Sequence, residues 1–177
     1  EVTLEDDLMR RDLTINAMAR SEAGELFDPF GGQVDIKNKT LRHVSDAFSD
    51  DPVRVLRVAR FRARLGPDWA VDTDTWNLML EMTLSGELNH LTRERVVKEM
   101  ENAFGEPHYW LFFQTLSQLN ALEVVMPELA NSSFDCRTCV VGRKRGSVAF
   151  QYAKVANSMD TETMKQFEAR LNISNEW

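Results

Sequence analysis

Apolar residues recur at helical spacing along most of this chain. In the stretch VRVLRVARFRARL, residues 53–65, Leu56, Ala59 and Ala63 fall on one face, as in a helix that buries one side. The same periodicity predicts helices at residues 72–86, 90–105 and 106–122, and two weaker ones near 146–158 and 161–171. From residue 49 onward the pattern is almost purely helical.

The first part of the chain predicts a mixture of helix and strand. Residues 3–20 predict one helix, with Thr3 as its N-cap and Asp6 three residues later. Glycine and proline surround a short strand predicted within residues 22–32, and residues 39–44 predict a second one. We expect these strands to pair as an edge hairpin whose sheet partners lie upstream, because two strands alone are marginally stable.

The composition is that of a soluble globular protein, with 43% hydrophobic and 28% charged residues among 177. No apolar run is long enough to cross a bilayer, and no signal peptide opens the chain. Cys136 and Cys139 alone cannot close a four-ligand zinc site, so we expect free thiols in a cytoplasmic protein with no membrane partner. The chain starts without methionine, inside a helical pattern, which suggests a piece of a longer protein.

Positive charge is concentrated on the predicted helix at residues 53–65, although the net charge of the chain is −7. The helix follows directly on Asp50 and Asp51. Four of its arginines share an arc of about 120° on the helix surface, namely Arg54, Arg57, Arg60 and Arg64.

This charged face has two interpretations. The first is a solvated helix surface with local ion pairs. The second is nucleotide recognition, in which a carboxylate accepts a hydrogen bond from the exocyclic amine of a base and an arginine donates to the same base edge. The remaining arginines would then face phosphates, which suit the planar guanidinium.

Two long motifs favour the second interpretation. RRDLTINAMA (residues 10–19) and DDPVRVLRVARF (residues 50–61) resemble the second and fourth signature motifs of class II tRNA nucleotidyltransferases, the CCA-adding enzymes. Residues 28–44 are similar to the segment that joins head and neck in that family, and residues 86–101 resemble its conserved neck turn. The resemblance is collinear over about residues 1–129 and is closest to the gamma-proteobacterial enzymes.

The resemblance implies an enzyme that adds C, C and A to the 3′ end of tRNA without a nucleic-acid template, using CTP, ATP and Mg²⁺. In that family a Glu-Asp-x-x-Arg motif selects the incoming base. The matching positions are Asp50, Asp51 and Arg54, with aspartate in place of the first glutamate. Asp51 and Arg54 would therefore read the base.

The resemblance also implies roles for the other charged residues of the two motifs. Arg11, Arg57 and Arg60 would contact the phosphates of the nucleotide. Asp12 and Asn16 would lie on the sugar side or support the site. The aromatic residues Tyr109, Trp110, Phe112 and Phe113 are expected in the core, at helical spacing, rather than stacked on a nucleobase.

The carboxylates that hold Mg²⁺ in that family belong to an Asp-x-Asp motif that follows a Gly-Gly-x-x-Arg-Asp loop. No Gly-Gly-x-x-Arg-Asp loop occurs in this sequence, so its Asp-x-Asp at residues 72–74 follows none. DTD at residues 72–74 predicts a helix N-cap, and Asp28 and Asp35 flank predicted turns. We therefore expect no metal ligand in this chain, catalytic carboxylates upstream, and weak nucleotide binding without catalysis by the chain alone.

The prediction is a mainly α-helical fold with a small β-sheet left from a nucleotidyltransferase head of the DNA polymerase β type. Residues 1–44 would form the C-terminal part of that head. Residues 45–130 would form a helical neck that binds nucleotide and tRNA, and residues 131–177 a shortened body.

Several alternatives stay open. A bacterial poly(A) polymerase and an A-adding enzyme share the head and neck motifs, and a non-catalytic helical RNA-binding protein belongs to a different class. The basic residues Arg143, Lys144 and Arg145 fit either a solvated loop or a contact with the tRNA backbone. The oligomeric state is not determined by the sequence.

Overall fold

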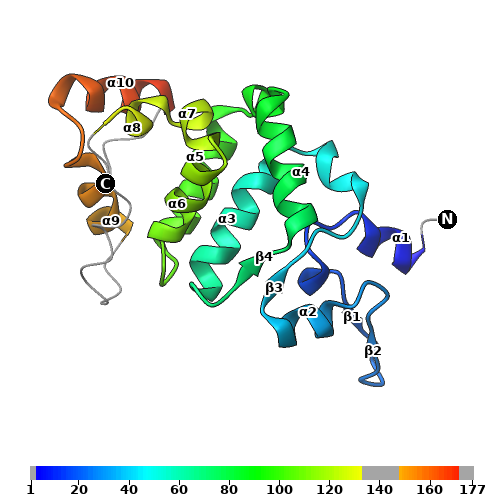
Figure 1. The fold of residues 1–177 in the computed structure, drawn as a ribbon. Helices are drawn as coiled ribbons and strands as arrows, with labels where there is room; N and C mark the ends of the chain where they lie inside the picture. Colours follow the sequence, from blue (N-terminus) through cyan, green and yellow to red (C-terminus); the bar gives the residue numbers. More distant parts are fainter. Residues whose placement is uncertain (1–2, 133–147, 172–177) are drawn as a thin grey trace.

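The computed structural model describes residues 3–132 and 148–171 (Figure 1). Its α-helices are α1 (Leu4–Met9), α2 (Gly32–Asn38), α3 (Val53–Leu65), α4 (Thr73–Leu84), α5 (Arg93–Phe104), α6 (Trp110–Gln118), α7 (Ala121–Val125), α8 (Pro127–Ala130), α9 (Val148–Ala156) and α10 (Thr161–Leu171). Its strands are β1 (Ala19–Arg20), β2 (Leu26–Phe27), β3 (Thr40–Leu41) and β4 (Ala70–Val71). The predicted mainly α-helical fold with a small β component is confirmed.

Helix α3 lies near the middle of the molecule and packs against α5 and α6 (Figure 1). The apolar face predicted for it is buried: Leu56, Ala59 and Ala63 each have 0% exposure. The aromatic residues of α6 complete this core, since Phe112 and Phe113 are fully buried. The expectation that these rings belong to the core is confirmed.

The helix predicted over residues 3–20 is much shorter in the structure. Thr3 caps α1 as expected, in a reciprocal pair of hydrogen bonds with Asp6, but α1 ends at Met9. Leu13 is extended and forms an isolated β-bridge with His43, and a 3-10 helix over Thr14–Asn16 follows. The buried Leu13 side chain and the backbone bonds to residues 42–43 outweigh the local helical spacing.

The strand pairing differs from the predicted hairpin. β2 pairs antiparallel with β1, and β3 pairs in parallel with β4, which lies about thirty residues further along the chain. Helix α2 separates β2 from β3, where no helix was predicted. Asp28 holds the start of α2, because its carboxylate accepts hydrogen bonds from the backbone N–H groups of Gly32 at 2.7 Å and Gln33 at 2.9 Å.

Replacing Gly32 by alanine is expected to lower the free energy of unfolding by roughly 1–3 kcal/mol, because the new methyl group overpacks a filled space. Its Cβ would overlap the carbonyl oxygen of Thr14 and lie 3.0 Å from the sulfur of Met18. Urea unfolding followed by circular dichroism measures the change. Gly105→Ala is the control, because its nearest neighbour lies at 3.4 Å; an equal loss in both variants would contradict the packing argument.

The remaining helices follow the predicted periodicity with shifted ends. Asp72 caps α4 as expected, accepting from the backbone N–H of Asp74 at 3.2 Å. The helix predicted over residues 106–122 is divided into α6 and α7 by Asn120, whose φ is 56°. Within the described residues, no helix is both long and apolar enough to cross a membrane.

Candidate functional site

An open cavity of about 920 Å³ lies between the N-terminal residues, the start of α3 and one face of α5. Six basic and four acidic side chains line it, so its local charge is positive in an acidic protein. The basic ones are Arg10, Arg11, Arg54, Arg57, Arg95 and Lys98, and the acidic ones are Asp12, Asp51, Glu94 and Glu99. Positive potential in a cleft favours anionic ligands.

The structure brings six of the eight predicted site residues to this cavity, which are Arg11, Asp12, Asn16, Asp51, Arg54 and Arg57. Asp50 and Arg60 do not line it. Asp50 is exposed at the end of a 3-10 helix over Asp46–Asp50, and Arg60 is buried beneath the cavity. Their direct contact with a nucleotide stays a prediction without support from this geometry.

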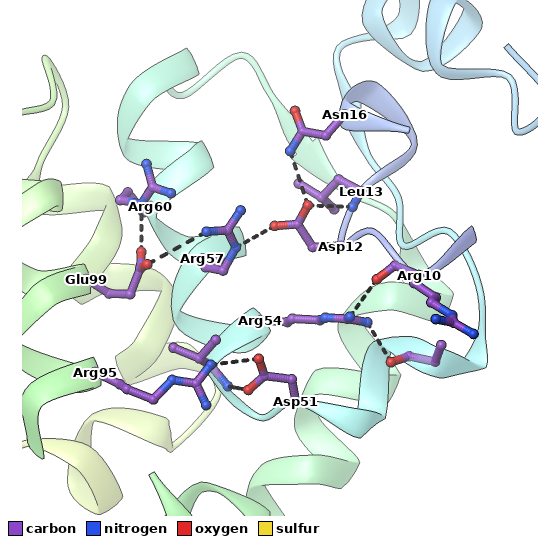
Figure 2. Close-up of polar contacts among 12 residues, drawn as sticks. Arg10, Asp12, Leu13, Asn16, Asp51, Arg54, Arg57, Arg60, Arg95 and Glu99 are labelled. Carbon is purple, nitrogen blue, oxygen red and sulfur yellow. Dashed lines mark hydrogen bonds and ion pairs between the residues drawn. The ribbon is translucent and has the colours of Figure 1, made fainter. Parts of the chain in front are cut away.

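Asp12 and Arg57 join the N-terminal segment to α3 (Figure 2). The Nε of Arg57 donates to Oδ2 of Asp12 at 2.6 Å, while Oδ1 accepts from the backbone N–H of Leu13 and from the side chain of Asn16. Burial to 6% exposure by itself would raise the pKa of Asp12. The hydrogen bonds outweigh burial and hold the pKa below its ordinary value, so Asp12 stays ionised.

Next to the Asp12–Arg57 pair, the arginines of α3 form ion pairs with carboxylates of α5 and of the turn that follows it. Arg60 donates to Glu99 at 2.7 Å, and both side chains are about nine-tenths buried. Arg57 lies 3.9 Å from the other oxygen of Glu99. Further along α3, Arg64 pairs with Glu106 at 2.8 Å. These contacts fix α3 against α5.

Asp51 lines the cavity, and two elements hold its carboxylate (Figure 2). Oδ1 accepts from the backbone N–H of Val53 at 3.2 Å, and Oδ2 accepts from Nη2 of Arg95, on α5, at 2.7 Å. Partial burial favours a higher pKa for Asp51, but the bond from Arg95 and the bond from Val53 lower it overall. The carboxylate is therefore an oriented, ionised hydrogen-bond acceptor.

Arg54 points toward the N-terminal segment and makes no ion pair with Asp51 (Figure 2). Its Nη1 donates to the carbonyl of Ala47 at 2.5 Å, and its Nη2 donates to the carbonyl of Arg10 at 2.6 Å. A guanidinium has five N–H donors, so these bonds leave donors on Arg54 that can meet a ligand. Arg11 is exposed and donates to Asp7 at 3.1 Å and to the carbonyl of Asn16 at 3.0 Å.

Six cavity residues were not among the predicted site residues, namely Arg10, Val53, Glu94, Arg95, Lys98 and Glu99. Three of these are Arg95, Lys98 and Glu99 of α5. They occur at positions i, i+3 and i+4 of α5, which places them on one helix face. That spacing, inside the segment that resembles the neck turn, was the available signal. It did not say which partner each side chain would have.

No group of three or more His, Cys, Asp or Glu side chains that could hold a metal ion occurs among residues 3–132 and 148–171. Asp28 caps α2, and Asp35 pairs with Arg42 at 3.2 Å. Cys136, Cys139 and the basic stretch at residues 143–145 lie outside the described residues.

Comparisons with known proteins agree with the order of these elements. A model described as "Poly A polymerase head domain" matches residues 1–42, and one described as "Probable RNA and SrmB- binding site of polymerase A" matches residues 69–132. A CCA-adding enzyme of Marinobacter nauticus is 46% identical over 168 residues, and a multifunctional CCA protein of Shewanella denitrificans is 57% identical over 129.

These matches cover 90% and 72% of this chain, but only 44% and 31% of the two relatives, so the chain spans less than half of their length. Among solved structures, the Thermotoga maritima CCA-adding enzyme complexed with tRNA matches 98% of this chain and 46% of its own, with a TM-score of 0.75 and 26% identity. A CCA-adding enzyme complexed with ATP covers 97% of this chain and 44% of its own, with a TM-score of 0.74 and 28% identity.

Proposed function

Because this chain belongs to the class II tRNA nucleotidyltransferases, the family of the CCA-adding enzymes, we propose that it forms the nucleotide-selecting part of an enzyme that adds CCA to tRNA. CTP, ATP and tRNA are the proposed substrates. The observation that carries the proposal is the cavity at the start of α3, which holds Asp51 and Arg54 between a segment matching a polymerase head and one matching an RNA-binding region.

The selection follows from hydrogen-bond chemistry. Cytosine and adenine both carry an exocyclic amine, whereas uracil and guanine carry a carbonyl at the equivalent place. An ionised Asp51 can only accept, so it favours the amine and repels the carbonyl. The remaining N–H groups of Arg54 would donate to ring nitrogen or carbonyl oxygen on the same base edge.

The phosphates would lie against the basic side chains of the cavity. Arg11 and Arg57 line it and are partly exposed, so their free N–H groups suit phosphate oxygens. Asp12 uses both oxygens in internal bonds, which fits a role in holding Arg57 rather than the sugar. Arg60 is buried and paired with Glu99, so it would affect the site through the position of α5.

Phosphoryl transfer in this family uses Mg²⁺, and the described residues contain no cluster that fits the ion. We assign no Mg²⁺ ligand to this chain and derive no catalytic step through the metal. Catalytic carboxylates outside these 177 residues are part of the proposal.

The deciding assay uses the full-length protein with tRNA that lacks its 3′ end, Mg²⁺, and CTP and ATP separately and together. Growth by C, C and one A is expected. Long A tails would identify a poly(A) polymerase, which the matched head family also includes by its description. A single A added only to a CC end would identify an A-adding enzyme, and bound tRNA without extension would favour a non-catalytic protein.

Asp51→Ala and Arg54→Ala are each expected to reduce the preference for CTP over UTP, and for ATP over GTP, by about 10–100-fold. This follows from the 1–3 kcal/mol that one good base contact contributes to discrimination. The ratio of kcat/KM values measures it. Arg64→Ala is the control for the same helix, since Arg64 lies outside the cavity; unchanged ratios in Asp51→Ala and Arg54→Ala would reject the base-reading role.

A further inference from the structure

Arg95 is the cation that contacts the carboxylate of Asp51, and neither sequence motif identified it. We propose that Arg95 is a specificity-determining positioning residue, which fixes the orientation of Asp51 so that the site accepts cytosine and adenine, which carry an amine where uracil and guanine carry a carbonyl, and rejects the other two bases. This inference rests on the proposed function, because it assumes that Asp51 reads the base.

The geometry assigns the orientation of Asp51 to two groups on different elements. The backbone N–H of Val53, in the first turn of α3, binds Oδ1, and the guanidinium of Arg95, on α5, binds Oδ2. Together they fix both oxygens and therefore the plane of the carboxylate. Two of its roughly four lone-pair sites stay available to a base.

The arginine that is closer in sequence does not supply this contact. Arg54 donates to the carbonyls of Ala47 and Arg10 and not to Asp51, although its charge helps to lower the pKa of that carboxyl. Without Arg95, Oδ2 of Asp51 would have no side-chain partner of opposite charge, and the carboxylate could rotate. Orientation, more than charge, is what Arg95 contributes, because an aspartate whose side chain is 33% exposed is ionised at neutral pH in either case.

The position of Arg95 depends on how α5 packs against α3. Glu99 lies one helical turn further along α5 and pairs with the buried Arg60 of α3 at 2.7 Å. This pair fixes α5 against α3, and thereby the separation between Arg95 and Asp51. Glu99 also favours the charged form of Arg95: the bond to Asp51 is the main reason that the pKa of Arg95 is raised, and the field of Glu99 adds to it.

The test compares Arg95→Ala and Arg95→Lys in the full-length protein, with kcat/KM measured for CTP, UTP, ATP and GTP. Arg95→Ala is expected to lower the CTP:UTP and ATP:GTP ratios by about tenfold, the size of one lost base-edge contact. Arg95→Lys should recover part of the ratio, because it can still donate to Oδ2. Arg93→Ala is the control, since Arg93 lies on the same helix, pairs with Glu94 and does not line the cavity.

Two outcomes would overturn the inference: unchanged CTP:UTP and ATP:GTP ratios in Arg95→Ala, whether or not all four kcat/KM values fall together, or a loss of tRNA affinity alone. Thermal unfolding of each variant shows that it is folded. In the Asp51→Ala background, Arg95→Ala should have no further effect on the ratios. If Asp51→Ala itself leaves them unchanged, the proposed function fails; if only Arg95→Ala leaves them unchanged, this inference alone fails.

Discussion

Replacing Glu99 by glutamine is expected to lower the free energy of unfolding by about 3 kcal/mol, because it leaves a buried guanidinium without its carboxylate. Glu99 and Arg60 bond at 2.7 Å, with side-chain exposures of 9% and 10%. The other carboxylate near Arg60 is that of Glu106, which lies at 3.8 Å and is also paired with Arg64. The pair also joins α3 to α5, so the cavity should open or distort in the variant.

Equilibrium unfolding in urea, followed by tryptophan fluorescence, measures the loss. Glu101→Gln makes the same chemical change two residues later on α5 and should alter stability by no more than about 0.5 kcal/mol, as is usual away from buried pairs. Equal effects of the two substitutions would show that the ion pair with Arg60 does not stabilise the fold. A Glu99→Gln variant as stable as the parent would contradict the prediction in the same way.

Replacing Arg57 by alanine is expected to cost about 2–3 kcal/mol at neutral pH, because it leaves a buried carboxylate unpaired. Asp12 is 6% exposed and would keep only Leu13 and Asn16 as partners. The cost lies at the low end for buried pairs because the side chain of Arg57 is itself 35% exposed. The N-terminal segment should separate from α3 more readily.

This cost should depend on pH. In the parent chain the pKa of Asp12 lies below its ordinary value of 3.8, so the contact with Arg57 stabilises the fold above that pH, and the stabilisation is lost as pH falls through the lowered pKa. In Arg57→Ala the bond and the charge of Arg57 no longer lower the pKa of Asp12, and only the bonds from Leu13 and Asn16 still oppose burial, so less of this stabilisation is present above that pH. The difference between the two proteins is therefore larger at about pH 7 than at about pH 4.

Urea unfolding at both pH values tests this sign. Adding Asp12→Asn to Arg57→Ala should recover part of the stability, because a neutral amide replaces the uncompensated charge. Arg64→Ala removes an arginine of the same helix that is 51% exposed, and should cost no more than about 1 kcal/mol. A pH-independent loss, or no recovery by Asp12→Asn, would contradict the explanation.

Local patterns predicted the helices well because each depends on nearby residues. The burial of Leu56, Ala59 and Ala63 follows from their spacing, and Asp72 caps α4 through a bond two residues away. The helix prediction failed where backbone groups distant in sequence compete for the hydrogen bonds of the segment. Residues 10–20 have helical spacing, yet the backbone N–H of Thr14 bonds to the carbonyl of Arg42, and a local rule does not include that partner.

For the candidate site, too, the sequence predicted some features and not others. The sequence by itself determined that two acids precede α3 and that four arginines share one of its faces, and its two motifs determined the family. It did not distinguish Arg57, which reaches the cavity, from Arg60, which is buried, because both lie on the charged arc. Only the position of α5 in the folded chain makes that distinction.

The tertiary structure decided which charges pair. Arg57 bonds to Asp12 across 45 positions of sequence, Arg60 to Glu99 across 39, and Arg95 to Asp51 across 44. The residue type determines which hydrogen bonds a side chain can donate or accept, and the periodicity of the sequence predicts the helix face on which it lies. The partner depends on how the helices pack, and that packing is set by the whole buried core rather than by the residues that it brings together.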